Sequence, residues 1–288
     1  MVGRDGLAER FEGHRAVLCG VAYRLLGSAS EADDAVQEAW FRLSRVDVDG
    51  VENLAGWLRT VVSRVCLDML RVRRARREEL VGSVPERVWD GSGPEPEAVL
   101  IDTVGRALVV VLDALGPAER VAFVLHDMFA VPFEEIAVIV GRSVVATKKL
   151  ASRARQRVRG RSVVSGGELA GHREVVEAFL VAARGGDVAG LLAVLAPDVV
   201  RRADPAALPV GGSVVLRGAD AVARGTVGFA ARARFAAVAL VDGAVGVVVA
   251  PGGRLLFVLT VRVVAGRIAA YEVVADPVRL RGMEVAVL

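Results

Sequence analysis

Apolar side chains recur every three or four positions in the N-terminal part of the chain, a pattern that predicts amphipathic helices. Gly27 ends the first of these helices, and the hydroxyl of Ser28 or Ser30 caps the second. A third helix follows, and the three helices form a first predicted domain over residues 1–77. The predicted helices cover residues 9–26, 31–43 and about 54–77.

The helical pattern stops at residues 78–97, where Gly and Pro are frequent, and this stretch is predicted to be a linker. Apolar periodicity then returns. Four further helices form a second predicted domain over residues 98–161. They cover residues 98–114, 118–127, 133–140 and the basic stretch from about 143 to 159.

The last two of these helices have the pattern of a helix-turn-helix. Glu134 and Glu135 lie in the first turn of the leading helix, where carboxylates suit the positive end of the helix dipole. Gly141 can take the left-handed conformation that a tight turn needs, and Ser143 can cap the next helix. The pattern therefore predicts two helices joined by a short turn.

The second helix of this motif is strongly basic. Residues 142–161 contain eight Arg or Lys and no Asp or Glu, while Val145, Leu150 and Ala154 are predicted to pack on the preceding helix. Such a helix fits the major groove of DNA, with phosphates along its flanks. A solvated surface helix, or one lying on an anionic membrane, is the alternative.

The C-terminal part of the chain changes character. A short linker at 162–171 precedes helices at about 172–183, 187–197 and 220–229. Strands are predicted at 246–250, 254–264 and 267–274, with hairpin turns between them. Helices followed by a curved antiparallel sheet predict an α+β domain over residues 172–288, with an interior pocket.

Charge is sorted along the chain although the net charge is only +3. Residues 1–165 carry 24 basic and 23 acidic side chains in separate blocks, which predicts two macromolecular contacts of opposite sign. The helix at 31–43 has four acids on its outer face, which fits either a solvated face or a basic partner surface. Five arginines between Arg71 and Arg77 match a phosphate track.

The two cysteines, Cys19 and Cys66, lie within apolar helical patterns and are predicted to be reduced. We found neither a signal peptide nor an apolar run of membrane-spanning length, so a soluble cytoplasmic protein without a membrane partner is expected. No cofactor, metal site or catalytic residue is predicted.

The N-terminal motifs resemble those of the extracytoplasmic-function (ECF) sigma factors of bacterial RNA polymerase. Residues 22–43, from Ala-Tyr-Arg-Leu-Leu-Gly to Trp-Phe-Arg-Leu, are similar to the second conserved region of that family. The resemblance implies that this acidic helix docks on the β′ clamp of core RNA polymerase. The residues expected to make this contact are Asp33, Asp34, Gln37 and Glu38.

Two further segments resemble the promoter-reading parts of the family. Residues 55–71 are similar to the segment that reads and opens the −10 element, and 115–159 are similar to the fourth region, which reads the −35 element and meets the β flap. Trp57 could also be an ordinary core residue. The expected −10 contacts are Trp57, Arg59, Arg64, Arg71, Arg73 and Arg74, and the expected −35 contacts are Thr147, Lys148, Lys149, Ser152, Arg153 and Arg155.

Residues 172–281 resemble the SnoaL-like domains, related to ketosteroid isomerase, that are fused to one subgroup of these factors. The resemblance implies that the C-terminal domain regulates the sigma domains within the same chain. Two subgroup motifs depart from the pattern: the linker motif is reduced to residues 89–96, and a glycine-rich loop to Asp204 with Gly211 and Gly212.

The function of this third domain is left open by the sequence. Catalysis would need an acid or base with a shifted pKa in an apolar pocket. The candidates are His172, Asp198, Asp204 and Tyr271, whose spacing is not diagnostic. A pocket that senses a small molecule and a module that only contacts protein are the other two interpretations.

The preferred interpretation is a sigma factor that brings core polymerase to −10 and −35 promoter elements. One alternative is a helix-turn-helix repressor or activator with a small-molecule sensor domain, which would not need the acidic helix. Another is a SnoaL-like enzyme carried by a DNA-binding domain.

Overall fold

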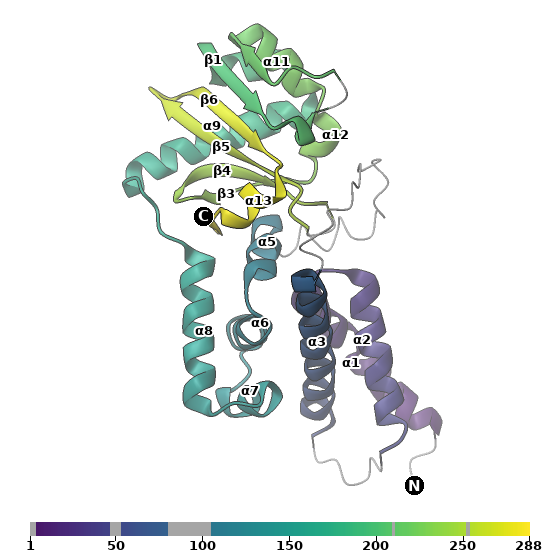
Figure 1. Cartoon of the computed structure of the whole chain (residues 1–288). Coiled ribbons are helices and arrows are strands. Elements are labelled where there is room, and N and C mark those ends of the chain that lie inside the picture. The colour runs from purple at the N-terminus through teal and green to yellow at the C-terminus, as the bar shows by residue number, and fades with distance from the viewer. Residues whose placement is uncertain (1–3, 47–52, 80–104, 209–210, 252–253) are drawn as a thin grey trace. The chain divides into compact units, whose positions relative to one another are not determined.

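The computed structural model describes residues 4–46, 53–79, 105–208, 211–251 and 254–288 (Figure 1). The predicted linker at 78–97, with the reduced linker motif at 89–96, lies almost entirely outside these residues. The chain forms two compact units, and the division falls inside two helices, after Val111 and after Gln156. Each unit is described by itself below.

The first unit begins with the three predicted helices: α1 (Arg4–Leu26), α2 (Ala29–Leu43) and α3 (Leu54–Glu79). They pack against one another in pairs around a core of leucine, valine and alanine side chains. The hydroxyl of Ser28 accepts a hydrogen bond from the backbone N–H of Glu31 and so caps α2, as predicted. The sequence pattern identified all three helices because each buries one continuous apolar stripe.

The next helices are α5 (Arg106–Ala114), α6 (Pro117–Phe123), α7 (Phe133–Val140) and α8 (Val144–Arg159). A π-helical turn, Val124–Met128, follows α6 where the sequence predicted one continuous α-helix. Gly141 between α7 and α8 has φ 69° and ψ 42°, and Ser143 Oγ accepts from the N–H of Ala146 at 3.2 Å. The predicted helix-turn-helix is therefore present, with the expected turn and cap.

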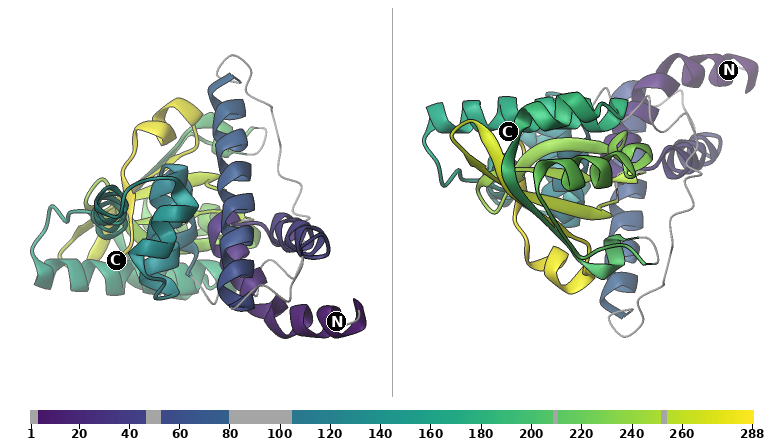
Figure 2. Two further views of the ribbon diagram at one scale, coloured as in Figure 1. Left: turned by 90° about the horizontal axis from the view of Figure 1, so that it is seen from below. Right: turned by 90° about the horizontal axis from the view of Figure 1, so that it is seen from above.

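The second unit contains most of the C-terminal domain. Its helices and strands are α9 (Gly166–Gly185), α10 (Val188–Val194), β1 (Leu195–Ala203), a 3-10 helix (Pro205–Ala207), β2 (Val215–Arg217), α11 (Ala219–Val227), α12 (Ala230–Ala233), β3 (Ala236–Val241), β4 (Ala244–Val249), β5 (Phe257–Val264), β6 (Arg267–Val274), α13 (Pro277–Gly282) and β7 (Val285–Ala286). The strands form one curved sheet in the order β2-β1-β6-β5-β4-β3-β7. Helix α9 lies along this sheet, as the right view of Figure 2 shows.

The fold class is the predicted α+β class, with three corrections in detail. The sheet is mixed, because β1 pairs with β6 in parallel while the other neighbours are antiparallel. Leu195 begins a strand rather than continuing the preceding helix. Residues 166–171, predicted to be linker, are helical because Ser165 and Glu168 form a capping box at the start of α9.

Strand β3 was not predicted at all. Its sequence, Ala-Ala-Val-Ala-Leu-Val, has no polar alternation and is rich in alanine, so its pattern favours neither helix nor strand clearly. It becomes a strand because β4 and β7 pair with its two edges. The tertiary structure therefore decides the conformation of this segment.

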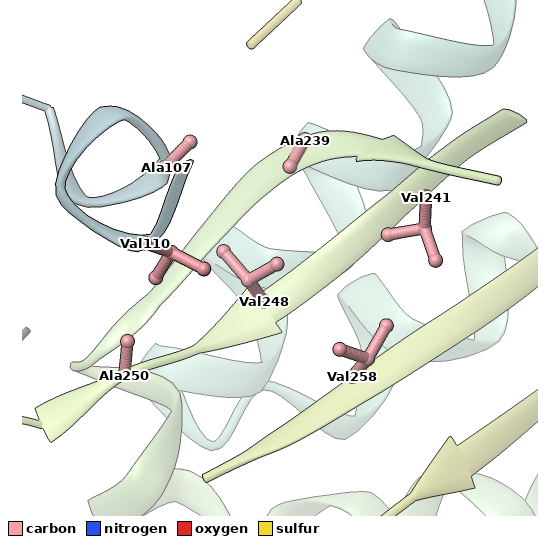
Figure 3. Packing of buried hydrophobic residues seen from close by; sticks show 7 residues of the cluster. All are labelled: Ala107, Val110, Ala239, Val241, Val248, Ala250 and Val258. Atoms are coloured by element: carbon pink, nitrogen blue, oxygen red, sulfur yellow. The ribbon is translucent and has the colours of Figure 1, made fainter. Parts of the chain in front are cut away.

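The first part of α5 belongs to the core of the second unit. Ala107 and Val110 pack in a cluster with Ala239 and Val241 of β3, Val248 and Ala250 at β4, and Val258 of β5 (Figure 3). The side chains of Ala107 and Val110 are 7% and 5% exposed. A helix predicted to belong to the helix-turn-helix domain thus contributes apolar side chains to the core beneath the C-terminal sheet.

Candidate nucleic-acid interface

One face of α8 forms a continuous exposed stripe. Side chains at positions separated by three or four residues share a face of a helix, and these positions are exposed along the whole of α8. Helix α8 has no Asp or Glu, so the charge of this stripe is entirely positive. The stripe consists of Val145, Lys148, Lys149, Ser152, Arg153 and Gln156.

The opposite face of α8 points into the first unit. Thr147, Ala151 and Ala154 are buried, and the Thr147 hydroxyl donates to the carbonyl of Ser143 at 2.9 Å. Thr147, expected to contact the −35 element, therefore lies off the exposed stripe. Val145, expected to pack inward, is 66% exposed, because the inward positions follow the spacing 147, 151 and 154.

Arg155 lies beside the stripe and has a partner within the unit. Its Nε donates to Asp127 Oδ1 at 2.6 Å, and both side chains are about one-third exposed or less. Lys148 places its Nζ 5.8 Å from the centre of the Phe133 ring on α7. These contacts fix the start and the end of α8 against the helix-turn-helix core.

The arginines of α3 differ in what they contact. Arg59 Nη2 donates to Glu135 Oε2 of α7 at 2.6 Å, and Arg64 Nη2 donates to the Val138 carbonyl of the same helix at 3.1 Å. Arg71 is exposed and pairs with Asp68 at 3.2 Å. Arg59 and Arg64 therefore both contact α7, whereas Arg71 is accessible to a partner.

Arg73 occupies a structural position. Its guanidinium pairs with Glu31 at the start of α2 and donates to the Leu26 carbonyl at the end of α1 at 3.0 Å. The side chain thus joins three helices. Arg74 is exposed, and Trp57 is half-buried on α3.

The acidic face of α2 is accessible. Asp33, Asp34 and Gln37 are exposed, and Glu38 is half-buried and pairs with Arg42 at 2.9 Å. Phe41, one turn beyond Gln37, is 49% exposed. The face therefore offers carboxylates and one aromatic ring to a partner.

Of the residues considered for chemistry in the second unit, Asp204 has a structural role. Partial burial works to raise its pKa, but amide hydrogen bonds from Ala275 and Asp276 and the Arg279 guanidinium hold the pKa below its usual value. A carboxyl group with a lowered pKa is a poor general base. The Asp204 carboxylate instead joins the end of β1 to the start of α13.

Tyr271, by contrast, lies inside an apolar cavity of the unit. Burial raises its pKa, against the lowering effects of the Thr226 hydrogen bond and of nearby Arg201. The described residues that line the cavity include no Asp, Glu or His. Asp198 is exposed and His172 half-buried, and neither lines the cavity, so the described lining lacks the acid–base pair that an isomerase of this fold would need.

Two other kinds of site are absent from the part of the chain that the structure describes. In the described ranges, no group of three or more His, Cys, Asp or Glu side chains is arranged to hold a metal ion. No helix in the same ranges is long and apolar enough to cross a membrane.

Known protein families match the two helical domains in the expected order. Residues 10–77 match the family described as Sigma-70 region 2, and residues 105–158 match Sigma-70, region 4. The second match covers α5 to α8, including the basic stripe. Two such regions in this order define a sigma factor.

Whole proteins support a narrower assignment. The ECF RNA polymerase sigma factor SigJ of Mycobacterium tuberculosis is 38% identical over 289 residues, covering 94% of this chain and 92% of the relative. A probable ECF sigma factor SigI of the same organism is 37% identical, covering 77% and 76%. The chain therefore belongs to the ECF family of RNA polymerase sigma factors, and it directs the initiation of transcription.

A solved relative covers nearly the whole length. The crystal structure of the Mycobacterium tuberculosis sigma factor SigJ aligns with 96% of this chain and 98% of that chain, at 33% identity and a TM-score of 0.46. Like other sigma factors, this protein is a transcription regulator rather than an enzyme, and its partners are core RNA polymerase and promoter DNA.

Two features of these surfaces were missed by the sequence reasoning. Val145 and Gln156 complete the exposed stripe of α8, and Phe41 extends the acidic face of α2. The helical spacing of Val145 with Lys148 and Lys149 could have shown that they share a face. No comparable signal marked Phe41, because an aromatic residue on a helix is usually buried.

Proposed function

We propose that the two charged faces divide the work of this sigma factor between polymerase and promoter. The observation that carries the proposal is their segregation: α2 exposes Asp33, Asp34 and Gln37, while α8 exposes Lys148, Lys149 and Arg153. Charge complementarity then directs the acidic face to a basic surface and the basic face to phosphates.

The acidic face binds the β′ clamp of core polymerase. Asp33, Asp34, Gln37 and Glu38 supply the polar contacts, and the exposed Phe41 ring supplies an apolar contact beside them. An exposed aromatic ring bordered by charged groups is typical of a protein interface. Helix α2 therefore has the composition of a docking helix.

The stripe on α8 enters the major groove of the −35 element. Lys148, Lys149 and Arg153 bind phosphates or base edges, with Ser152 and Gln156 as shorter polar contacts. Arg155 reinforces the helix through Asp127, and Thr147 supports it from inside. Region 4 also meets the β flap of the polymerase.

The basic face of α3 meets the melted −10 region. Arg64, Arg71 and Arg74 are exposed, while Arg59 becomes available when it leaves Glu135. Trp57 offers an aromatic plane on the same helix for an unstacked base. Arg73 contributes by holding α1, α2 and α3 together.

The C-terminal domain regulates the sigma domains within the chain. The observation that supports this regulation is the position of α5. This helix begins region 4, and its Ala107 and Val110 pack in the cluster with β3, β4 and β5. A change in this domain can thus be transmitted to region 4 through a continuous helix. The protein acts in the cytoplasm, where polymerase and chromosome are found.

Run-off transcription with purified core polymerase tests the division of work. The double variant Asp33→Lys, Asp34→Lys should lower promoter-dependent transcript by more than about tenfold, because like charges at an interface cost several kcal/mol. Asp220→Lys is the matched control, an exposed acid on α11 of the second unit. A double variant as active as Asp220→Lys would exclude this face of α2 from the contact with polymerase.

A further inference from the structure

An apolar cavity lies within the second unit, between α9, α11 and the sheet. Its volume is about 60 Å³, which leaves room for roughly four to six atoms the size of a water molecule. Four aromatic rings line it, those of Phe179, Phe229, Phe257 and Tyr271, together with Val247 and Leu259. The cavity is therefore suited to a small molecule with an apolar part.

One buried cation breaks this apolar lining. Arg201 on β1 is 4% exposed, and its side chain lines the cavity. Its Nη2 donates to the Ser213 carbonyl at 2.9 Å, while its Nε is buried and has no hydrogen-bond partner among the described residues. No carboxylate of the described residues pairs with it.

Such an arrangement is costly unless something compensates it. Removing a guanidinium from water without an opposite charge destabilises the folded state, and buried charges are normally paired. Arg202, the next residue on the same strand, has its side chain exposed on the other face of the sheet. Arg201 therefore points inward at a position where the described part of the chain supplies no charge partner.

The other polar groups of the cavity satisfy one another. The Thr226 hydroxyl donates to the Val222 carbonyl at 2.8 Å, so Tyr271 is left to donate to Thr226 Oγ1 at 2.7 Å. A second arginine, Arg232, donates to the Ala207 carbonyl and lies over the Phe229 ring. Two cations and no acid among the described lining residues give the cavity a positive potential.

We propose that this cavity binds a small monocarboxylate, whose carboxylate pairs with Arg201 and whose short branched or unbranched tail lies among the aromatic rings. A planar carboxylate matches the fork of donors on a guanidinium. A neutral apolar molecule would bring no opposite charge to Arg201, and inorganic phosphate would leave the apolar part of the cavity unfilled. The proposal concerns binding alone and does not depend on the promoter contacts proposed above.

Isothermal titration of the full chain with isobutyrate tests the proposal, with isobutyramide as the uncharged probe of the same shape. Saturable binding of isobutyrate is expected, and the amide should bind about 10- to 100-fold more weakly, the usual effect of losing a charged hydrogen bond. Acetate tests the contribution of the tail and should bind more weakly than isobutyrate.

Two variants locate the site. Arg201→Met removes the charge but keeps an apolar side chain of similar length, and it should weaken isobutyrate binding about 10- to 100-fold. Arg202→Met is the matched control and should bind like the natural chain. The circular dichroism spectrum of each variant reports whether the domain is folded, and Arg201→Lys, which keeps the charge, should restore part of the affinity.

Three results would overturn the proposal. The first is the absence of saturable isobutyrate binding to the natural chain. The second is equal affinity for isobutyrate and isobutyramide. The third is binding that Arg201→Met and Arg202→Met weaken alike. Because each readout is direct binding, failure in transcription assays would leave this test unaffected.

Discussion

Arginine side chains in the first unit serve either the fold or the surface. Arg120 is 2% exposed and pairs with Asp113 at 3.3 Å, and Arg73 joins three helices through Glu31 and Leu26. Arg153 is exposed on the stripe of α8. Removing an arginine of the first kind takes a partner from a half-buried carboxylate or a buried carbonyl, whereas removing Arg153 leaves the fold intact.

The stripe on α8 predicts how promoter binding responds to salt. Arg153→Ala should weaken holoenzyme binding to a −35 duplex and lower the salt slope by about one if Arg153 binds a phosphate, or cost about 1–3 kcal/mol and relax specificity if it binds guanine. Fluorescence anisotropy over a salt series measures both. Arg224→Ala, an exposed arginine on α11, is the control, and an unchanged slope and affinity for Arg153→Ala would exclude it from the interface.

The two cysteines predict a difference in reactivity. Burial raises the pKa of Cys66 to about 12, and burial together with Asp33 raises the pKa of the half-exposed Cys19. The thiolate is the reactive form, so a raised pKa slows alkylation at pH 8, and the rate rises with pH. Iodoacetamide should modify Cys19 slowly and Cys66 only after unfolding.

The same cysteine reports on docking of the acidic face. Cys19 Sγ lies 3.7 Å from Asp33 Oδ1, so core polymerase bound to α2 should protect Cys19 from alkylation. Mass spectrometry of the free and polymerase-bound chains measures this protection. Equal labelling in the two states would contradict contact at this end of α2.

Among the helices of the first unit, the contact between α3 and α7 has consequences for promoter opening. Glu135 of α7 pairs with Arg59, and the Val138 carbonyl accepts from Arg64. The two contacts hold part of the basic face of α3 against the helix-turn-helix. In the −10 contact proposed above, DNA would therefore compete with α7 for Arg59.

This competition predicts a gain of binding. Glu135→Gln removes the negative charge, and because the ion pair is partly exposed it should cost only about 0.2–1 kcal/mol of stability. Binding of a single-stranded −10 fragment should strengthen by a similar free energy, measured by anisotropy. Glu134→Gln, an exposed neighbour on α7, is the control, and equal behaviour of the two variants would show that the pair does not limit access.

For the whole molecule, the division into two units does not follow the family regions. Region 4 matches residues 105–158, yet the units divide within α5 and within α8. At the end of α8 the Val158 carbonyl accepts from Val287 N–H at 2.8 Å, so the segment just after β7 is tied to the end of α8. Both ends of region 4 thus belong to the C-terminal unit.

Val110 belongs to region 4 but packs in the cluster with β3, β4 and β5, so we expect the stability of the second unit to depend on it. Val110→Asp places a charge in an apolar cluster and should destabilise the second unit by about 3 kcal/mol or more. Ala114→Asp, at the exposed end of the same helix, should cost far less. Hydrogen exchange of β3 and β4 amides measures the effect, and unchanged protection in Val110→Asp would contradict the packing of α5 on the sheet.

Local patterns determined the helices, because each helix of the first unit buries one periodic stripe and carries its own cap or turn residue. Gly141 and Ser143 sufficed to predict the helix-turn-helix, and charge blocks together with family motifs predicted both macromolecular partners. Segments that Gly and Pro interrupt, or that consist of alanine and valine without alternation, carried too little local information to be predicted.

Only the tertiary structure decided which faces and partners those elements use. Thr147 is buried and Val145 is exposed, the reverse of what the sequence predicted, because the position of α7, rather than the composition of α8, sets the buried face. Strand β3 exists because β4 and β7 satisfy its backbone hydrogen bonds, and the parallel pairing of β1 with β6 places Arg201 beside Tyr271. Contacts between residues far apart in sequence fix these features, and no periodicity within one segment encodes them.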